Sequence, residues 1–310
     1  MKVKIATQGF TSDAGIFLAM DKGYFKEQGI DAEWVLIVRG TDTFPLLATG
    51  EMQVAGGTID AALFNAIQRG VNVKMVADKA SNPKGSRFVG VTVRKDLADQ
   101  IKTTADLKDR TIAMGCEACQ TDFLVELWLK DGNLTFNDVK KVIMYNPADH
   151  IPALANKTVE VAHMMEPFIT IATDQGLVVP WLWAGDRDPG QTGSVVLFSE
   201  AFAKDVDAGR RFMLAYLKGV RDYNDAINKG KNKADLVAIL SKYTSLKDPK
   251  LYDKVGMPGL NVDGKINLPS MVQLHDFLLR TAAIKEKADL TKIVDMQFAD
   301  YAAQRLGPYN

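Results

Sequence analysis

The chain carries one pattern twice, at a constant offset of 107 residues between residues 1 to about 92 and residues 108 to about 199. A register that runs so far without an insertion indicates one supersecondary unit used twice. Two unrelated α/β units would also share some apolar positions by chance. Two matched units predict two lobes with a site between them. The matched pairs include Ile5 with Ile112, Ala6 with Ala113, Asp42 with Asp149, Pro45 with Pro152, Val54 with Val161 and Val89 with Val196.

Each unit alternates strand-like and helix-like segments. Short apolar runs are followed by capping residues and by an apolar face at helical spacing, and such alternation predicts a doubly wound parallel sheet in each lobe. Thr58 and Thr121 are the expected caps of two of these helices, and Glu166-Pro167 opens another. Strands are expected at 3–7, 33–38, 54–57, 73–77 and 88–93 in the first unit, and at 111–114, 142–145 and 159–163 in the second.

The last third of the chain is different, because residues 200–310 read as mostly helical. The spacing of Met271, Leu274, Phe277 and Leu278 predicts one buried helix face. Helices are expected over 207–228, 233–243, 269–281 and 290–306.

Charge and hydropathy narrow the possible partners. Lys plus Arg and Asp plus Glu both number 38, so there is no basic excess to attract nucleic acid, and we expect no nucleic-acid partner. No apolar run reaches the length of a membrane span. Because Met1 leads directly into strand-like sequence, we expect either a cytoplasmic protein or one whose targeting peptide is absent from this sequence.

The candidate site follows from the strand order. Ligands of open parallel sheets bind beyond the carboxyl ends of the strands, which selects three loops in each unit. Asp13 would equally serve as a helix cap, and Phe10 as a core residue. The expected ligand-binding residues are Gln8, Phe10, Thr11, Asp13, Arg39, Thr41, Gly57 and Thr58 on one wall, and Cys116, Glu117, Thr121, Asn146 and Glu166 on the other.

The only cysteines, Cys116 and Cys119, have the spacing of a thioredoxin-like dithiol at a helix N-terminus. The Pro usual between such cysteines is missing, and Glu117 would oppose thiolate formation. We therefore expect a local disulfide or two buried thiols. The chain has three histidines and no second cysteine pair, which gives little support for a zinc site. It also lacks the Gly-rich nucleotide motifs. We expect no metal, no cofactor and no catalytic residue.

Several segments together resemble a known family. They are 15–25, 46–51, 101–113, 166–168 and 199–202, and the similarity covers roughly residues 3–220. The chain resembles the nitrate/sulfonate/taurine branch of bacterial ABC-transporter solute-binding proteins, a branch that includes binders of thiamine-pyrimidine precursors.

The resemblance implies a type II periplasmic-binding-protein fold, with two α/β lobes joined by two crossover strands. Lobe I would comprise 1–92 and 199–310, lobe II would comprise 93–198, and the hinge strands would lie near 88–93 and 194–198. The lobes would close on the solute. It further implies a monomeric, non-enzymatic, extracytoplasmic receptor. This receptor would deliver a sulfonate, a pyrimidine or other heteroaromatic, or an aromatic acid to an ABC permease.

Two departures bear on the ligand. Met165 stands where family members often have Trp, and the usual Gly- and Ser-rich loop holds Cys116, Glu117 and Cys119. With Arg39 as the only cation among the expected site residues, a small oxyanion such as nitrate is disfavoured and a heteroaromatic or amide-bearing solute is favoured.

Two other functions stay open. The first is a small-molecule enzyme on the same fold, pyrimidine-synthase-like or dehydratase-like, with His150 or Cys116 as its reactive group. The second is a dithiol oxidoreductase that uses Cys116 and Cys119.

Overall fold

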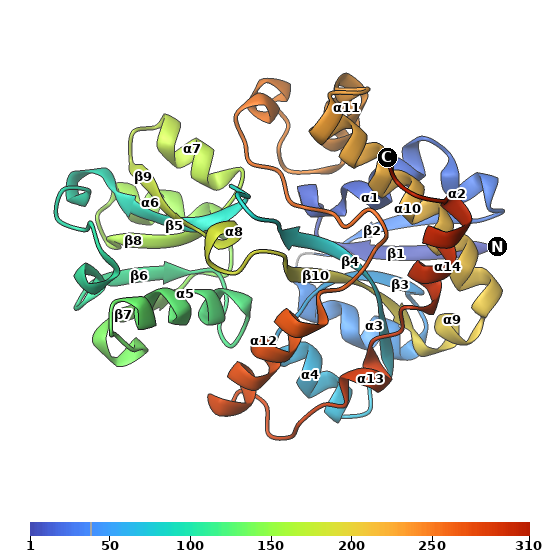
Figure 1. Ribbon diagram of the computed structural model, residues 1–310, viewed down its shortest axis with the longest axis horizontal. Coiled ribbons are helices and arrows are strands. Elements are labelled where there is room, and N and C mark those ends of the chain that lie inside the picture. The colour runs from blue at the N-terminus through green and yellow to red at the C-terminus, as the bar shows by residue number, and fades with distance from the viewer. Residues whose placement is uncertain (38) are drawn as a thin grey trace.

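The computed structural model describes residues 1–37 and 39–310, and it contains two five-stranded sheets with helices on their faces (Figure 1). We call the first sheet and its helices lobe I, and the second sheet and its helices lobe II. The strand orders are β2-β1-β3-β10-β4 and β7-β6-β8-β5-β9. The first sheet contains β1 (Lys2–Thr7), β2 (Asp31–Leu36), β3 (Val54–Thr58), β4 (Val73–Asn82) and β10 (Gln191–Ser199). The second contains β5 (Val89–Arg94), β6 (Thr111–Met114), β7 (Lys140–Ile143), β8 (Val161–Met165) and β9 (Val178–Trp183).

Helices of lobe I come from both ends of the chain, whereas those of lobe II come from its middle (Figure 1). Lobe II has α5 (Gln120–Asp131), α6 (His150–Ala155), α7 (Phe168–Asp174) and α8 (Ala184–Arg187). Lobe I has α1 (Ala14–Asp21), α2 (Tyr24–Glu27), α3 (Thr43–Thr49), α4 (Ala61–Gln68), α9 (Glu200–Lys204), α10 (Val206–Lys229), α11 (Lys233–Tyr243), α12 (Leu268–Arg280), α13 (Leu290–Ile293) and α14 (Gln297–Leu306).

The strand registers confirm the repeat. Lys4 pairs with Glu33 in the first sheet, and Thr111 pairs with Lys140 in the second, 107 residues later on both strands. Likewise the pair of Ile5 with Val54 recurs as Ile112 with Val161. Because a register slip would turn every side chain to the opposite face, equal registers mean that the two units bury equivalent residues.

The two units exchange one strand each. β5 follows the first unit in the chain but lies in the second sheet, antiparallel between β8 and β9. In return, β10 lies in the first sheet, antiparallel between β3 and β4. Each exchanged strand has hydrogen-bonded neighbours on both sides and is therefore an integral part of its new sheet.

The exchange places the expected hinge strands within the two sheets. Residues 88–93 and 194–198 lie almost entirely inside the sheets, and the chain passes between the sheets at 83–88 and 184–190. Most of β10, assigned to lobe II from the sequence, belongs to the lobe I sheet. Val89 pairs with Met165 and Ser194 pairs with Thr58, so the structural equivalent of Val89 is Ser194 and not Val196.

The C-terminal helices complete the core of lobe I. Phe212, Tyr216 and Val220 lie on the buried face of α10, which packs against α1. The predicted buried face of α12 is confirmed, since Met271, Leu274, Phe277 and Leu278 are all buried. The helix expected over 290–306 is instead divided, because Val294 bridges to Met75 of β4 and the Asp295 N–H donates to the Met75 carbonyl.

Two expected helix starts were wrong, and one strand end lies outside the described residues. Thr58 remains in β3, and Asp60 caps α4 by accepting a hydrogen bond from the Leu63 N–H at 2.8 Å. Thr121 lies inside α5, whose N-cap is Cys119. The strand expected at 33–38 ends at Leu36, and Val38 is the residue that the structure leaves undescribed.

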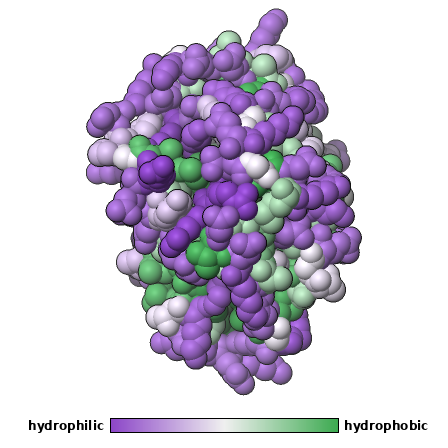
Figure 2. Space-filling model, turned by 90° about the vertical axis from the view of Figure 1, so that its right-hand side faces the viewer, coloured by the Kyte–Doolittle hydropathy of each residue, from purple (hydrophilic) through white to green (hydrophobic). Residues whose placement is uncertain are grey.

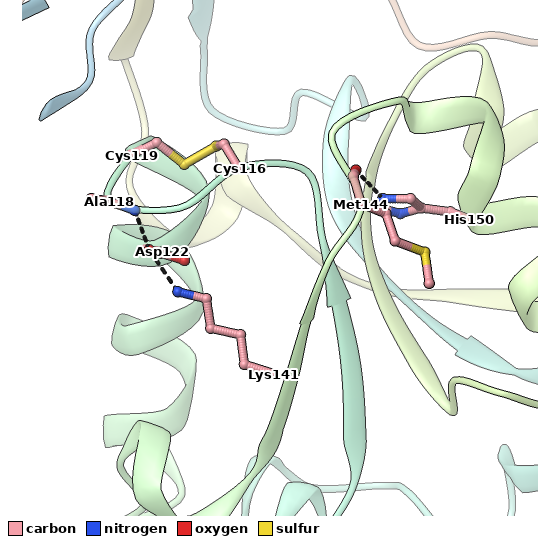
Figure 3. Close-up of a disulfide and its surroundings, with 7 residues drawn as sticks. All are labelled: Cys116, Ala118, Cys119, Asp122, Lys141, Met144 and His150. Carbon is pink, nitrogen blue, oxygen red and sulfur yellow. Dashed lines mark hydrogen bonds and ion pairs between the residues drawn. A yellow bond between two sulfur atoms is a disulfide. The ribbon is translucent and has the colours of Figure 1, made fainter. Parts of the chain in front are cut away.

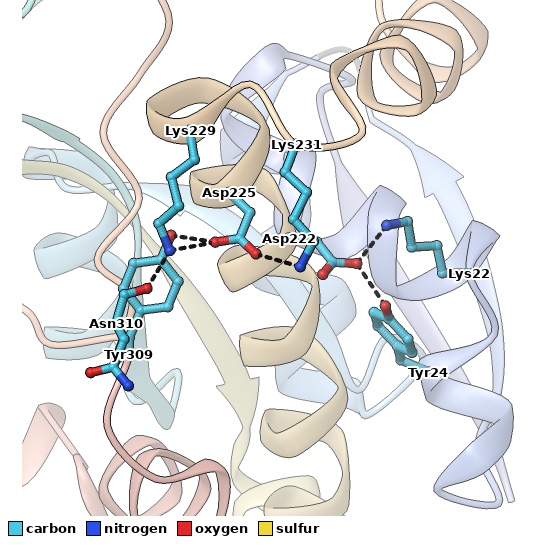
Figure 4. A network of polar contacts seen from close by, with 8 residues as sticks. All are labelled: Lys22, Tyr24, Asp222, Asp225, Lys229, Lys231, Tyr309 and Asn310. Carbon is cyan, nitrogen blue, oxygen red and sulfur yellow. Dashed lines mark hydrogen bonds and ion pairs between the residues drawn. The ribbon is translucent and has the colours of Figure 1, made fainter.

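Two aspartates of α10 fix the outer end of lobe I (Figure 4). Asp222 accepts from Lys22 and from Tyr24, both at 2.6 Å, and so ties α10 to the α1–α2 segment. Asp225 accepts from Tyr309 at 2.8 Å, which holds the C-terminal segment against the same helix. Polar residues cover most of this end of the molecule, with smaller apolar areas between them (Figure 2). Among the described helices, none has both the length and the apolarity needed to cross a membrane.

Gly219 is predicted to be required for the contact between α10 and α1. A Cβ at this position would lie 2.2 Å from the Gly15 carbonyl oxygen. We expect Gly219→Ala to lower the free energy of unfolding by about 1–3 kcal/mol through overpacking, even though Ala is the better helix former. Urea denaturation measures this, with Gly115→Ala as control because nothing lies within 4 Å of its added Cβ. Equal stability of the two variants would contradict the close contact.

Candidate functional site

The predicted site residues differ in how far they are exposed to solvent. Gly57 and Thr58 lie at the carboxyl end of β3, and the others lie in loops or helix starts that follow β1, β2, β6, β7 and β8. Arg39, Thr41, Glu117 and Asn146 are exposed; Gln8, Phe10, Thr58, Cys116 and Thr121 are half-buried; Thr11, Asp13, Gly57 and Glu166 are buried.

Asp13 is held in a buried ion pair. Its Oδ1 lies 2.5 Å from the Nζ of Lys79 on β4, and its Oδ2 accepts the Phe10 N–H at 3.0 Å. The same Lys79 ammonium donates to Ser12 Oγ at 3.0 Å. Asp13 makes no side-chain capping bond to α1. The Asp13 carboxylate therefore holds the loop after β1 against the buried Lys79 side chain.

Gly56 makes room for this ion pair. A Cβ at Gly56 would lie 2.9 Å from two carbons of the Lys79 side chain and 3.2 Å from Asp13 Oδ1. Gly57 is one of the expected ligand-binding residues, and the structure shows tight packing at both Gly56 and Gly57. The Cβ of a residue at 57 would meet Leu197 at 2.6 Å.

Lys79 is a residue that sequence reasoning missed. It lies 66 residues from Asp13, and the available signal was the pair of charged residues, Asp78 and Lys79, within strand-like sequence. Its presence changes the charge balance expected for the site, because Lys79 is a second cation and it is paired with the acidic Asp13. The paired Asp13 no longer disfavours an anionic solute.

Asp78 carries the other buried charge of β4. Its Oδ2 accepts the Asn261 N–H at 3.0 Å, whereas Oδ1 has no hydrogen-bond partner. Burial raises the pKa of this carboxyl to about 7. Nearby on β10, Gln191 Nε2 and Ser194 Oγ are also buried without partners. Unpaired buried polar atoms thus gather where β4 and β10 approach the interlobe connections.

The cysteines form a disulfide in the loop between β6 and α5 (Figure 3). The Ala118 N–H donates to Asp122 Oδ2 at 2.6 Å, and Lys141 lies 2.9 Å from the same oxygen. The Ala118 carbonyl accepts the Ala61 N–H of lobe I at 3.0 Å. Of the alternatives left open for the two cysteines, the structure thus shows the local disulfide, and it places that loop against α4.

The Glu166 carboxylate forms its main hydrogen bonds within lobe II. Its carboxylate accepts the Thr170 N–H at 3.0 Å and the Thr170 Oγ–H at 2.8 Å, which caps the first turn of α7. Its Oε1 also lies 3.5 Å from the Gly256 nitrogen of lobe I. Burial raises the pKa of this carboxyl. Glu166, joined to Pro167 by a cis peptide, therefore supports the wall of the predicted site.

His150 is poorly placed for the enzyme alternative. The ring is buried, and its Nε2 lies 3.1 Å from the Met144 carbonyl oxygen (Figure 3). Burial lowers the pKa of His150. Cys116, the other candidate, is bonded to Cys119 and is not a free thiol. Among residues 1–37 and 39–310, no three His, Cys, Asp or Glu side chains are grouped to hold a metal ion.

Two cavities lie in lobe I away from these loops, and neither contains a predicted site residue. Their volumes are about 260 and 420 Å³. The first is lined by residues of α3, of α9 and of the loop before β4, and the second by Lys233, Ala234, Val237, Ala238, Pro249 and Asp253.

Removing the Lys79 ammonium is predicted to destabilise the fold strongly. Lys79→Met leaves Asp13 buried without its partner, and we expect a loss of about 3 kcal/mol in the free energy of unfolding at pH 7. The double variant Lys79→Met/Asp13→Asn should regain part of this loss, because no buried charge remains. Urea denaturation measures both. Equal losses in the two variants would rule out the ion pair as the cause.

Asp60 is predicted to make stability depend on pH. Burial raises the pKa of this carboxyl from 3.8 to about 6, so between these values the folded chain holds a proton that the unfolded chain has released. The contribution of Asp60 to stability should therefore fall as pH rises from 4 to 6.

Asp60→Asn keeps a capping oxygen and removes this titration. Relative to wild type, it should gain roughly 2 kcal/mol between pH 4 and 7 and change little above that range. Urea denaturation at several pH values measures the difference. A pH-independent difference would contradict the raised pKa.

Comparison with known proteins agrees with this architecture. The chain matches the NMT1/THI5-like family over residues 11–228. No curated protein matches its sequence.

Solved structures share the fold at low identity. The periplasmic aliphatic sulphonate binding protein SsuA from Escherichia coli is 20% identical, with a TM-score of 0.76 over 94% of this chain and 96% of that one. The periplasmic nitrate-binding protein NrtA from Synechocystis PCC 6803 is 18% identical, with a TM-score of 0.77 over 98% and 89%. The Candida albicans CA3427 product is 16% identical, with a TM-score of 0.68 over 95% and 96%. Because the family match spans more than half of its length, the chain belongs to the NMT1/THI5-like family.

Proposed function

We propose that this protein binds a small organic solute between its two lobes and delivers it to an ABC permease. The observation that carries the proposal is the equal strand register of the two lobes, which gives both of them matching loops at the carboxyl ends of their strands. Family membership supports it, as do relatives named for binding sulphonates and nitrate. An extracytoplasmic location and a monomeric receptor fit this role.

The proposed contacts divide into binding and supporting residues. Phe10 is half-buried and offers an aromatic face, and the exposed Arg39 offers a cation. Asp13 and Glu166 already accept internal hydrogen bonds and hold their loops in place. The further proposed ligand contacts are Gln8, Thr11, Thr41, Gly57, Thr58, Cys116, Glu117, Thr121 and Asn146.

The proposed solute is a sulfonate, a pyrimidine or other heteroaromatic, or an aromatic acid. Each combines a flat or apolar part, suited to Phe10, with polar atoms for the surrounding loops. With Asp13 neutralised by Lys79, an acidic group on the solute meets less negative charge than the sequence suggested. One relative, the Xanthomonas axonopodis protein SsuA, was solved bound to MOPS.

Lobe closure is the proposed mechanism of capture. The connections at 83–88 and 188–190 are the hinges, because they are the segments outside the strands and α8 where the chain passes from one lobe to the other. Small dihedral changes in such connections move the lobes as rigid bodies. The enzyme alternative is disfavoured by the buried His150 and by the disulfide-bonded Cys116.

A thermal-shift panel tests this function with an alkanesulfonate, nitrate, an aminopyrimidine and benzoate. At 100 times its dissociation constant, a bound solute stabilises the protein by about 2.7 kcal/mol. We expect at least one compound to raise the melting temperature. Failure of all four classes to shift it would count decisively against the proposal.

Phe10→Ala is predicted to weaken the binding of that compound about tenfold, because the aromatic contact is lost. Isothermal titration calorimetry measures the dissociation constant. Tyr301→Ala is the control, since Tyr301 is an exposed aromatic residue on α14, which lies at the end of lobe I away from lobe II (Figure 1). An equal effect of both substitutions would exclude Phe10 from the site.

A further inference from the structure

The geometry points to a second role for the Cys116–Cys119 disulfide, which is to control the contact between the lobes. We propose that the intact disulfide shapes a turn of lobe II that docks on lobe I, and that its reduction releases this contact. This inference does not depend on the identity of the solute or on transport. It rests on the contacts of the turn and of α5.

The turn holds a backbone conformation that its sequence does not favour. Ala118 has a φ of +52°, in the left-handed region that a residue with a Cβ adopts only when its surroundings enforce it. The disulfide closes the backbone on both sides of Ala118, and Asp122 accepts its N–H at 2.6 Å. The covalent bond is thus one of two restraints that keep Ala118 in this conformation.

This conformation directs the Ala118 carbonyl toward lobe I. The carbonyl accepts the Ala61 N–H at 3.0 Å. Ala61 is the first residue of α4, so its N–H has no acceptor within the helix. Cys119 also forms an isolated antiparallel bridge with Asp60. A change of the Ala118 backbone therefore removes an acceptor from lobe I.

The lobe contact continues along α5. Phe123 of α5 is buried in the lobe I core, with its ring centroid 5.7 Å from that of Phe277 on α12. One turn later, Glu126 accepts two hydrogen bonds from Arg280, at 2.8 and 2.6 Å. We call the contacts of the 116–119 turn, Phe123 and Glu126 with lobe I the seam. The reducible disulfide lies in the turn, at one end of the seam.

The chemical step is thiol–disulfide exchange with a dithiol reductant. Cys116 is half-buried and Cys119 is fully buried, so the attacking thiolate reaches the Cys116 sulfur first. The S–S bond breaks, a mixed disulfide forms at Cys116, and Cys119 leaves as a thiolate that takes up a proton. The second thiol of the reductant then displaces Cys116. Two electrons and two protons pass to the protein, and the reductant becomes a disulfide.

Amide hydrogen exchange of the full-length protein tests the proposal. Exchange at Ala61 is measured by NMR before and after treatment with dithiothreitol, and alkylation of a separate aliquot followed by mass spectrometry verifies that both thiols are free. We expect the Ala61 amide to exchange about tenfold faster in the reduced protein. Unchanged exchange in the fully reduced protein overturns the proposal.

Three variants separate the role of the disulfide from general destabilisation. Cys116→Ser/Cys119→Ser should exchange as the reduced protein does and should not respond to dithiothreitol. Ala118→Gly should keep part of the Ala61 protection when reduced, because glycine adopts a positive φ without steric cost. Arg280→Gln should loosen the opposite end of the seam while the disulfide remains oxidised. If Ala118→Gly loses as much protection on reduction as wild type, the turn conformation is not what the disulfide controls.

Discussion

The exchange of β5 and β10 between the two sheets is the constraint on which the rest of the structure depends. Each strand is hydrogen-bonded on both sides within the other unit's sheet, so neither unit can complete its sheet alone. The chain must therefore cross between the lobes at 83–88 and again at 188–190. Two crossings restrict the relative motion of the lobes far more than one flexible linker would.

The candidate site rests on groups that are themselves buried. The Lys79–Asp13 ion pair holds the loop after β1, and Gly56 leaves the space that the pair occupies. In lobe II, the disulfide and Glu166 play corresponding parts in the loops after β6 and β8. Buried charges and a covalent bond thus fix the backbone, while Arg39 and Asn146 are exposed at the ends of the loops, where Asn146 accepts the Ala148 N–H. This division is expected when preorganised loops bind a ligand with little loss of conformational entropy.

Local sequence patterns predicted the helices and strands well. They could not predict which segments pair with each other across long distances in the chain. The two lobes, α11 and the buried face of α12 followed from the repeat and from periodicity, whereas the family followed from the resemblance of several short segments. The offset of 107 could not show that β5 and β10 each lie in the other unit's sheet. A strand buries the same apolar residues whether it pairs within its own unit or within the other one. Lys79 was missed for a related reason, since its partner lies 66 residues away. The predicted helix cap was wrong where two possible capping residues lie close together, as Thr58 and Asp60 do. Which of the thirteen predicted residues touch a solute remains a prediction.

Native mass spectrometry of the full chain, mixed with a compound that shifts its melting temperature, tests the central claim most directly. A solute-binding protein should hold one molecule of the compound non-covalently and release it chemically unchanged on denaturation. Recovery of a converted product, or the absence of any complex at saturating concentration, would contradict the account.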